Sequence, residues 1–244
     1  MPTLLLFTLH LYTISYFQVR MNSLIGDSRS RGLKVGCAQQ LISDLWSIPG
    51  APLIRLDDEI RNSTILHHGV DYPIGRHHIY ISAGICNLTT RLRDRNTNYE
   101  EVIFDIAQSN TTIESTKDQI KKLKKIAHYE NADAIFCTIY PMSLKDWNNR
   151  RLAQNKTSNL KHSQSYKVMQ TELNKAVDSI NEFIFQINKS GNFSTPHFHK
   201  QITHNRKKNI AYKFNMLTDG CHPNNTLVKK QANSLAIAIE KNRT

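Results

Sequence analysis

Residues that could together activate a hydroxyl group lie at the two ends of this chain. Ser28 ends a Gly-Asp-Ser tripeptide near the beginning, and Asp219 and His222 belong to the segment LTDGCHPNN near the end. A serine becomes a nucleophile when a histidine can accept its proton and a carboxylate orients that histidine. Two residues separate Asp219 from His222, so a single turn lets the carboxylate reach one imidazole nitrogen while the other faces outward. The pattern predicts acyl transfer, provided that the two ends of the chain meet.

Each of these motifs also has an ordinary structural explanation. Asp27 and Ser28 are residue types that cap helices. Asp219 with the glycine after it forms a common turn, and Gly50 follows a proline, as turn glycines do. The motifs taken together favour the chemical interpretation, because of their order along the chain and the structural elements on which they are expected.

The spacing of apolar residues predicts alternating strands and helices. A short apolar run that ends at Gly26 predicts a first strand, and apolar residues at every fourth position up to Trp46 predict a helix after it. Further strands are expected in APLIRL (51–56), IYISAGI (79–85), ADAIFCTIY (132–140) and IAYKF (210–214), and further helices at 112–129, 173–187 and 226–242. The polar stretch 142–167 predicts a long loop or insertion, a candidate lid or docking surface.

Repeated strand-then-helix order implies a parallel sheet with helices on both faces, a three-layer α/β/α architecture joined by right-handed crossovers. We expect one domain over residues 21–244, preceded by a hydrophobic extension over residues 1–20. In such sheets ligands bind beyond the carboxyl ends of the strands. Ser28 is expected there, at the start of a helix, whose free backbone N–H groups can stabilise an oxyanion.

The combined motifs resemble those of the SGNH (GDSL-type) hydrolase family, over essentially the whole of residues 21–244. The residues that carry the resemblance are Gly26-Asp27-Ser28, Gly50, Gly84-Ile85-Cys86-Asn87 and Asp219-Gly220-Cys221-His222-Pro223. The third of these blocks is also similar to that of divergent SGNH domains in invertebrate mobile elements. The resemblance implies a flavodoxin-like fold and a cofactor-free serine esterase or acetylesterase acting on a small ester or acylated substrate. It implies that Ser28 is the nucleophile, His222 the base and Asp219 its orienting acid.

The oxyanion hole is where the sequence departs from the family pattern. The resemblance implies backbone donors at Ser28 and Gly50 and a side-chain donor from a Gly-x-Asn-Asp block. Aligning Gly84 directly puts Cys86 in the asparagine's place, and a thiol is a weak donor. Either the loop shifts by one residue so that Asn87 donates, or the hole lacks one donor, which typically costs about 10²–10³ in rate.

The chain of 244 residues carries a formal net charge of +12, which favours contact with polyanions. The alternative function is therefore a catalytically weak or inactive SGNH module that binds nucleic acid. Its basic surface would come from residues 117–125, 150–151 and 204–213, with Tyr212 and Phe214 available for stacking. A solvated basic face explains the same residues. We expect a monomer.

The histidine and cysteine patterns predict no metal site. The histidine pairs at 67–68 and 77–78 and the His-x-His at 197–199 have no zinc-type spacing with cysteines, and no C-x-x-C occurs. We expect buried free thiols at Cys37, Cys86, Cys137 and Cys221, with a disulfide or reactive pair between Cys86 and Cys221 as the less favoured alternative.

The first twenty residues carry an apolar run from Leu4 to Phe17. The run has no basic region before it and no small-residue cleavage site after it, and it is short for a bilayer span. A signal or anchor and a peripheral extension before Met21 both stay open, with membrane contact only if the segment anchors the chain. An intracellular location is slightly favoured over secretion or membrane anchoring.

Overall fold

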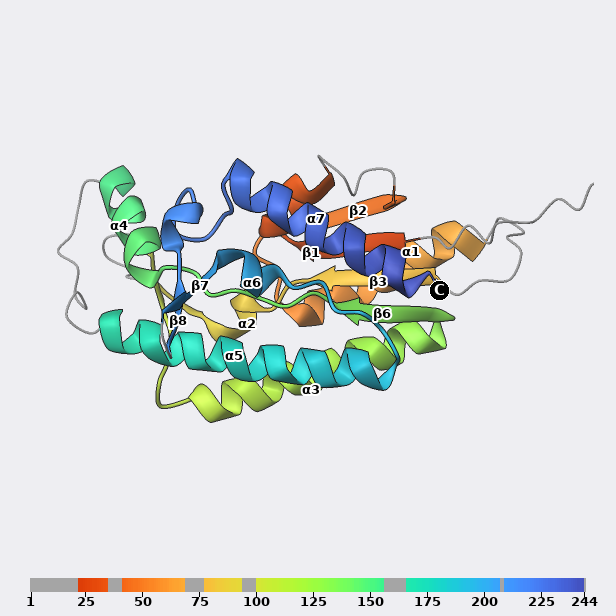
Figure 1. The fold of residues 1–244 in the computed structure, drawn as a ribbon. Coiled ribbons are helices and arrows are strands. Elements are labelled where there is room, and N and C mark those ends of the chain that lie inside the picture. The colour runs from red at the N-terminus through yellow and green to blue at the C-terminus, as the bar shows by residue number, and fades with distance from the viewer. Residues whose placement is uncertain are drawn as a thin grey trace, which may run out of the picture.

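A parallel sheet forms the centre of the molecule. The computed structural model describes residues 22–34, 41–68, 77–93, 100–155, 166–206 and 209–243. Four strands pair in parallel in the order β2-β1-β3-β6. They are β1 (Asn22–Asp27), β2 (Asp44–Ile48), β3 (His77–Ser82) and β6 (Ala132–Phe136). Figure 1 shows helices on both sides of this sheet, so the predicted α/β/α class is confirmed. The strand order is that of the first four strands of a flavodoxin-like sheet.

Alternate residues of the central strands face two separate hydrophobic cores, because successive side chains of a strand point to opposite faces. Ile25, Ile79 and Ile81 lie in the larger core, and Leu24 and Tyr80 lie in the smaller one. The larger core is covered by η2 (Leu53–Leu56), α1 (Asp57–His68), α2 (Ile85–Leu88), α3 (Ser109–Tyr129) and α5 (Tyr166–Ser190). The smaller core is covered by η1 (Ser28–Lys34), α6 (Phe198–Ile202) and α7 (Asn225–Asn242).

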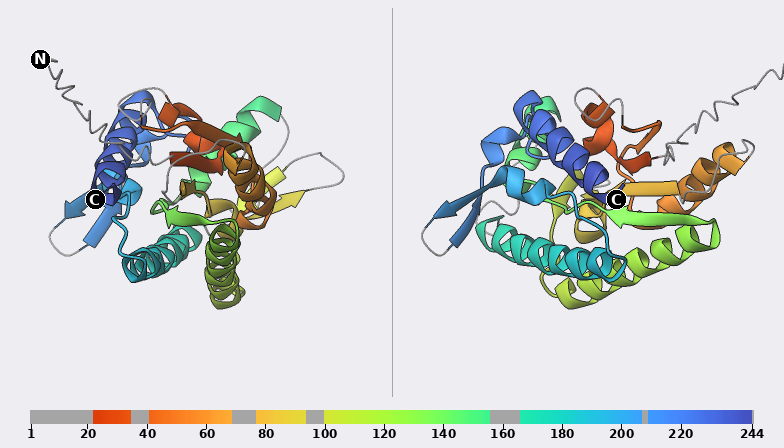
Figure 2. Two further views of the ribbon diagram at one scale, coloured as in Figure 1. Left: turned by 90° about the vertical axis from the view of Figure 1, so that its right-hand side faces the viewer. Right: turned by 45° about the vertical axis from the view of Figure 1, so that its right-hand side comes forward.

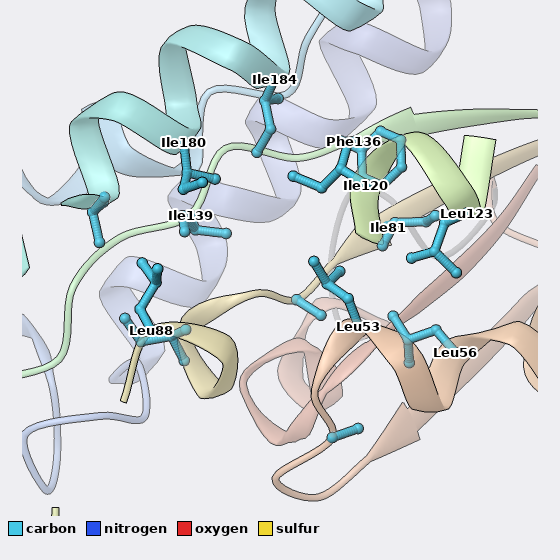
Figure 3. Close-up of a cluster of buried hydrophobic side chains, with 14 of the residues drawn as sticks. Leu53, Leu56, Ile81, Leu88, Ile120, Leu123, Phe136, Ile139, Ile180 and Ile184 are labelled. Atoms are coloured by element: carbon cyan, nitrogen blue, oxygen red, sulfur yellow. The ribbon is translucent and has the colours of Figure 1, made fainter. Parts of the chain in front are cut away.

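The two long helices α3 and α5 lie side by side under the sheet (Figure 2). Both were predicted from their apolar spacing, and the buried residues of α5 repeat every three or four positions at Leu173, Val177, Ile180 and Ile184. Figure 3 shows Ile180 and Ile184 in the same cluster as Ile81 and Phe136 of the sheet. The terminal helix α7 was also predicted correctly.

The predicted helix between Ser28 and Trp46 was wrong in its second half. The helical turn η1 ends at Lys34, and β2 occupies residues 44–48; residues 35–40 lie outside the described part. Leu45 fits a four-residue spacing, but it pairs with Leu24 as a strand residue. Consequently APLIRL is not the second strand. It contains η2, which begins after Pro52.

Two later expectations also need correction. The polar stretch expected as a loop contains the helix α4 (Leu144–Asn155), and residues 156–165 lie outside the described ranges. The segment IAYKF does not extend the central sheet. Its strand β8 (Asn209–Tyr212) pairs antiparallel with β7 (Thr203–Arg206) in a separate hairpin, followed by η3 (Phe214–Met216).

Side-chain amides, rather than a fifth strand, cover the outer edge of β6 and of the chain that follows it. Asn188 of α5 accepts from the N–H of Phe136 at 3.1 Å and donates to its carbonyl at 2.8 Å. Asn181, two turns earlier, makes the same pair of bonds with Ile139, both at 2.8 Å. The N–H of Thr138, between them, donates to the carbonyl of Pro196 at 3.0 Å. These amides satisfy buried backbone groups that a neighbouring strand would otherwise satisfy.

A second antiparallel hairpin, β4 (Thr90–Arg93) with β5 (Glu100–Ile103), stands beside the carboxyl end of the sheet. Asn148 of α4 bonds both the N–H and the carbonyl of Val102, at 2.9 and 2.8 Å, and so fixes α4 to this hairpin. None of the helices in the described ranges has an apolar run of the length that a bilayer crossing requires. The expectations for residues 1–20 lie outside the described residues.

Candidate active site

The structure brings the two ends of the chain together at the carboxyl ends of the parallel strands. The hydroxyl oxygen of Ser28 lies 2.9 Å from Nε2 of His222, and Nδ1 of the same ring lies 2.6 Å from Oδ2 of Asp219. A carboxylate only accepts hydrogen bonds, so Nδ1 carries the proton and Nε2 is left to accept from the Ser28 hydroxyl. Ser28, His222 and Asp219 therefore form a continuous hydrogen-bonded chain.

The loop before α7 fixes Asp219 from its own backbone. Oδ1 of Asp219 accepts from the backbone N–H groups of Cys221 and His222, at 2.9 and 2.7 Å. Partial burial raises the pKa of the Asp219 carboxyl, but the bonds from the His222 ring and these two N–H groups outweigh it and lower the pKa to about 2. The turn predicted at 219–220 is thus present, and its carboxylate also orients the imidazole.

The nucleophile candidate lies on a tight turn between β1 and η1. Gly26 lies so close to the neighbouring strand β3 that an added Cβ would lie 2.5 Å from the carbonyl oxygen of Ser82. Asp27, rather than Ser28, takes the capping role, because its carboxylate accepts from the N–H of Arg29 at 2.9 Å. The Arg29 guanidinium pairs with the same carboxylate at 3.2 Å and donates to the carbonyl of Tyr140. The Ser28 hydroxyl is thereby left for His222.

The backbone N–H groups of Ser28 and Gly50 are the candidate donors for an oxyanion. Ser28 and Gly50 both line the cleft, and the backbone N–H of Gly50 has no backbone acceptor among the described residues. Gly50 has φ = +64°, a conformation that a residue with a side chain rarely adopts. Gly50 and Ser28 therefore lie on the same cleft, and donation by their backbone N–H groups to an oxyanion stays a prediction.

The structure does not bring Asn87 to this site, so the predicted donation by Asn87 is wrong here. Its amide oxygen accepts from the N–H of Leu53 at 2.9 Å, and its amide nitrogen donates to Gln119 of α3 at 2.6 Å. Cys86, one residue earlier on α2, lines the cleft instead. The structure therefore agrees with the direct alignment of Gly84, in which Cys86 takes the place of the asparagine. Adjacent side chains on the short helix α2 point in different directions, so only one of the two lines the cleft.

Neither thiol of the cleft is suited to act as the nucleophile. Cys86 and Cys221 are both free and both line the cleft. Burial raises the pKa of the Cys86 thiol, and it raises the pKa of the Cys221 thiol to about 12. Because the thiolate is the reactive form, both thiols stay protonated and unreactive at neutral pH.

The cleft in front of Ser28 has a volume of about 520 Å³. One side is apolar and includes Ile85, Val102 and Met142, and Trp147 of α4 lies 5.9 Å from the His222 ring, centre to centre. The sequence prediction missed α4 and therefore missed Trp147 as a wall of the site. The pair Trp147 and Arg151, one helical turn apart, was the signal available in the sequence.

Comparisons with known proteins agree with this geometry at the level of the fold. No family model and no curated protein matches the sequence. A GDSL-like lipase from Bacteroides thetaiotaomicron is similar in structure, with a TM-score of 0.59 and 12% identity, covering 92% of this chain and 89% of that one. The chain has the fold of the SGNH hydrolases.

Two further structures support the SGNH fold. A candidate acylhydrolase from Bacteroides fragilis gives a TM-score of 0.60 at 12% identity, and the alignment covers 92% of this chain and 88% of the acylhydrolase chain. A member of the lipolytic G-D-S-L family from Veillonella parvula gives 0.51 at 12% identity, covering 88% of this chain and 95% of its own. The resemblance predicted from the motifs is confirmed for the SGNH fold, and at this identity it assigns no role to any residue.

Proposed function

We propose that the protein is a serine hydrolase that cleaves carboxylic esters through Ser28, His222 and Asp219. One observation carries the proposal. Ser28 and His222 lie 194 positions apart in the sequence, yet Ser28 Oγ lies 2.9 Å from His222 Nε2, while the opposite ring nitrogen faces a carboxylate. A capping serine has no need of an oriented imidazole, whereas an acyl-transfer serine requires one.

The first half of the reaction forms an acyl-enzyme. As Ser28 Oγ bonds to the ester carbonyl carbon, its proton passes to His222 Nε2, and the Asp219 carboxylate stabilises the resulting imidazolium. The negative charge that develops on the carbonyl oxygen is stabilised by the N–H groups of Ser28 and Gly50. When the carbon–oxygen bond to the alcohol breaks, His222 returns the proton to the leaving oxygen.

The second half of the reaction restores the enzyme. Water enters the cleft and gives a proton to His222 Nε2 as its oxygen bonds to the acyl carbon. The bond to Ser28 Oγ breaks, the serine regains its proton from His222, and the carboxylic acid leaves. Because Asp219 holds the Nδ1 proton throughout, the same ring nitrogen serves as base and acid in both halves.

No specific observation among the described residues supports the alternative of nucleic-acid binding. Several of the basic residues behind it are engaged within the chain: Lys117 and Lys121 pair with carboxylates of their own helix, Lys122 pairs with Asp57, and Arg151 pairs with Glu100. Nucleic-acid binding therefore stays an untested prediction.

Hydrolysis of 4-nitrophenyl acetate and labelling by a fluorophosphonate probe test the proposal. We expect Ser28→Ala and His222→Ala to lower kcat/KM at least about 10³-fold and to abolish labelling. Ser190→Ala and His204→Ala are matched controls, because both residues are exposed and lie outside the cleft. Circular dichroism and denaturant unfolding establish that each variant is folded. Ester cleavage at the wild-type rate in both site variants would overturn the proposal.

A further inference from the structure

The cleft in front of Ser28 is basic on its rim. Three arginines line it, and each comes from a different element: Arg31 from η1, Arg91 from β4 and Arg151 from α4. No aspartate or glutamate among the described residues lines this cleft. The buried Arg29 nearby is different, because the Asp27 carboxylate neutralises it.

Each arginine lies beside one part of the proposed catalytic machinery. Arg31 follows Ser28 by three residues in a 3₁₀ turn, where side chains three apart eclipse one another. An added Cβ on Gly50 would lie 3.2 Å from Nη2 of Arg91, so this guanidinium adjoins the oxyanion site. The third guanidinium, of Arg151, lies 5.3 Å from the centre of the Trp147 ring, which itself faces His222.

A single carboxylate positions two of these arginines without using up their hydrogen-bonding capacity. Glu100 of β5 pairs with Arg91 at 3.3 Å through one oxygen and with Arg151 at 3.1 Å through the other. A guanidinium has five N–H donors, so both arginines, which line the cleft, keep donors that Glu100 does not use. Arg31 is exposed and forms no ion pair with a carboxylate of the described residues. Among the described residues, the three rim arginines therefore carry more positive charge than the single Glu100 carboxylate matches.

We propose that this cleft selects esters that carry an anionic oxygen group, such as a carboxylate, phosphate or sulfate, near the ester bond. The inference rests on the proposed hydrolase function and adds the class of substrate. The anionic group binds the rim arginines, because charge-assisted hydrogen bonds from a guanidinium are stronger than neutral ones and match the geometry of these groups. The hydrocarbon part of the substrate packs on Ile85, Val102 and Met142.

Matched pairs of charged and neutral esters test this. Mono-4-nitrophenyl adipate and its methyl ester differ only by a charge on the acyl side, and 4-acetoxybenzoate and its methyl ester differ only by a charge on the alcohol side. Each kcat/KM is divided by the rate of hydroxide hydrolysis of the same ester to remove intrinsic reactivity. We expect at least about a tenfold preference for the anion in one pair, decreasing as salt rises. The pair that shows it identifies the side of the ester that carries the charge.

Substitution of the arginines separates a local site from the overall basic charge. We expect Arg91→Gln and Arg151→Gln to reduce the preference, which is the ratio of the two normalised rates, at least about fivefold, because the anionic ester loses more activity than the neutral one. Arg55→Gln removes the same charge from an exposed position outside the cleft and should change neither value. Equal normalised rates for the charged and neutral esters, or arginine variants that lose both activities equally, would overturn the inference.

Binding to the Ser28→Ala variant tests the same inference without turnover. Calorimetry with the intact esters should show tighter binding of the anionic member, and Arg91→Gln in this background should remove the difference. If the wild-type chain cleaves no ester but this difference is present, the proposed function fails and anion recognition stands. If esters are cleaved and the difference is absent, the substrate inference fails and the proposed function stands.

Discussion

The backbone N–H of Ser143 donates a hydrogen bond of 2.7 Å to the carbonyl oxygen of Gly220. Ser143 lies just before α4, and Gly220 lies between Asp219 and His222. The bond therefore ties the loop that orients the imidazole to the helix that supplies Trp147. Gly220 has φ = +84°, and an added Cβ would lie 2.6 Å from the backbone nitrogen of Trp147. The loop and the helix approach each other so closely only because residue 220 has no side chain.

Gly220→Ala should therefore damage both stability and catalysis. A left-handed conformation costs an L-residue about 1–2 kcal/mol, and the contact with α4 adds to this, so we expect the free energy of unfolding to fall by at least about 2 kcal/mol. Because the contact displaces His222, kcat on 4-nitrophenyl acetate should fall about 10²-fold in the folded protein. Urea unfolding and steady-state kinetics measure the two effects. An unchanged kcat would show that the loop positions His222 independently of α4.

Acid should remove the stabilisation that Asp219 contributes. Its pKa is about 2 in the folded protein, below the value of about 4 expected for an unfolded aspartate. The lowered pKa means that the contribution is fully present above about pH 4 and is lost as the pH falls through about 2. The difference in unfolding free energy between wild type and Asp219→Asn should shrink by about 2 kcal/mol over this window.

Urea unfolding of both proteins between pH 6 and pH 2.5 measures this difference. The carboxylate also stays ionised throughout the neutral range, so a loss of esterase activity between pH 7 and pH 5 belongs to another group. A stability difference that stays constant down to pH 2.5 would show that Asp219 titrates alike in the folded and unfolded chain.

Cys86 should contribute little to oxyanion stabilisation, since a thiol is a weak donor. We expect Cys86→Ala to keep kcat within about threefold of wild type, and Cys86→Asn, which places a strong donor on the cleft wall, to raise it about tenfold or more. Asn87→Ala is the contrasting variant. It should lower stability, because it leaves the N–H of Leu53 without its partner, and should leave kcat of the folded protein nearly unchanged. The reverse result would place Asn87 at the oxyanion.

Asn188 should matter for stability and not for catalysis. Asn188→Leu leaves the buried N–H and carbonyl of Phe136 unsatisfied, and each such group costs about 1–3 kcal/mol. We expect a loss of about 2–6 kcal/mol in the free energy of unfolding, with kcat on 4-nitrophenyl acetate unchanged. Gln186→Leu is the control on the same helix, because Gln186 is exposed. Equal losses in the two variants would contradict the role of the Asn188 amide.

The sequence predicted those elements whose apolar spacing is determined by a deep core. The helices α3, α5 and α7 and the buried strand β6 follow that rule. β2 did not, because it lies at the sheet edge with every residue only partly buried, and Leu45 coincided with a helical spacing. α4 was missed because it is largely polar and is held by Asn148 and the Ser143 bond rather than by an apolar stripe.

The residues of the candidate site also fall into those that the sequence could predict and those that it could not. Ser28, Asp219 and His222 could be predicted because each lies next to a recognisable strand end or turn. The choice between Cys86 and Asn87 could not, because a shift of one residue on a single helical turn decides which side chain enters the cleft. The three rim arginines come from separate elements, and only the tertiary structure brings them to one opening.

The asparagines of α5 also affect how this molecule meets its neighbours. An edge strand whose backbone N–H and carbonyl groups have no hydrogen-bond partners can pair with a strand of another chain. Many proteins prevent such pairing with charged residues or prolines on the edge strand. Here the groups at Phe136, Thr138 and Ile139 are already bonded within the chain. Loss of Asn181 or Asn188 would therefore lower the free energy of unfolding and would also expose this edge of the sheet to pairing with other molecules at high protein concentration.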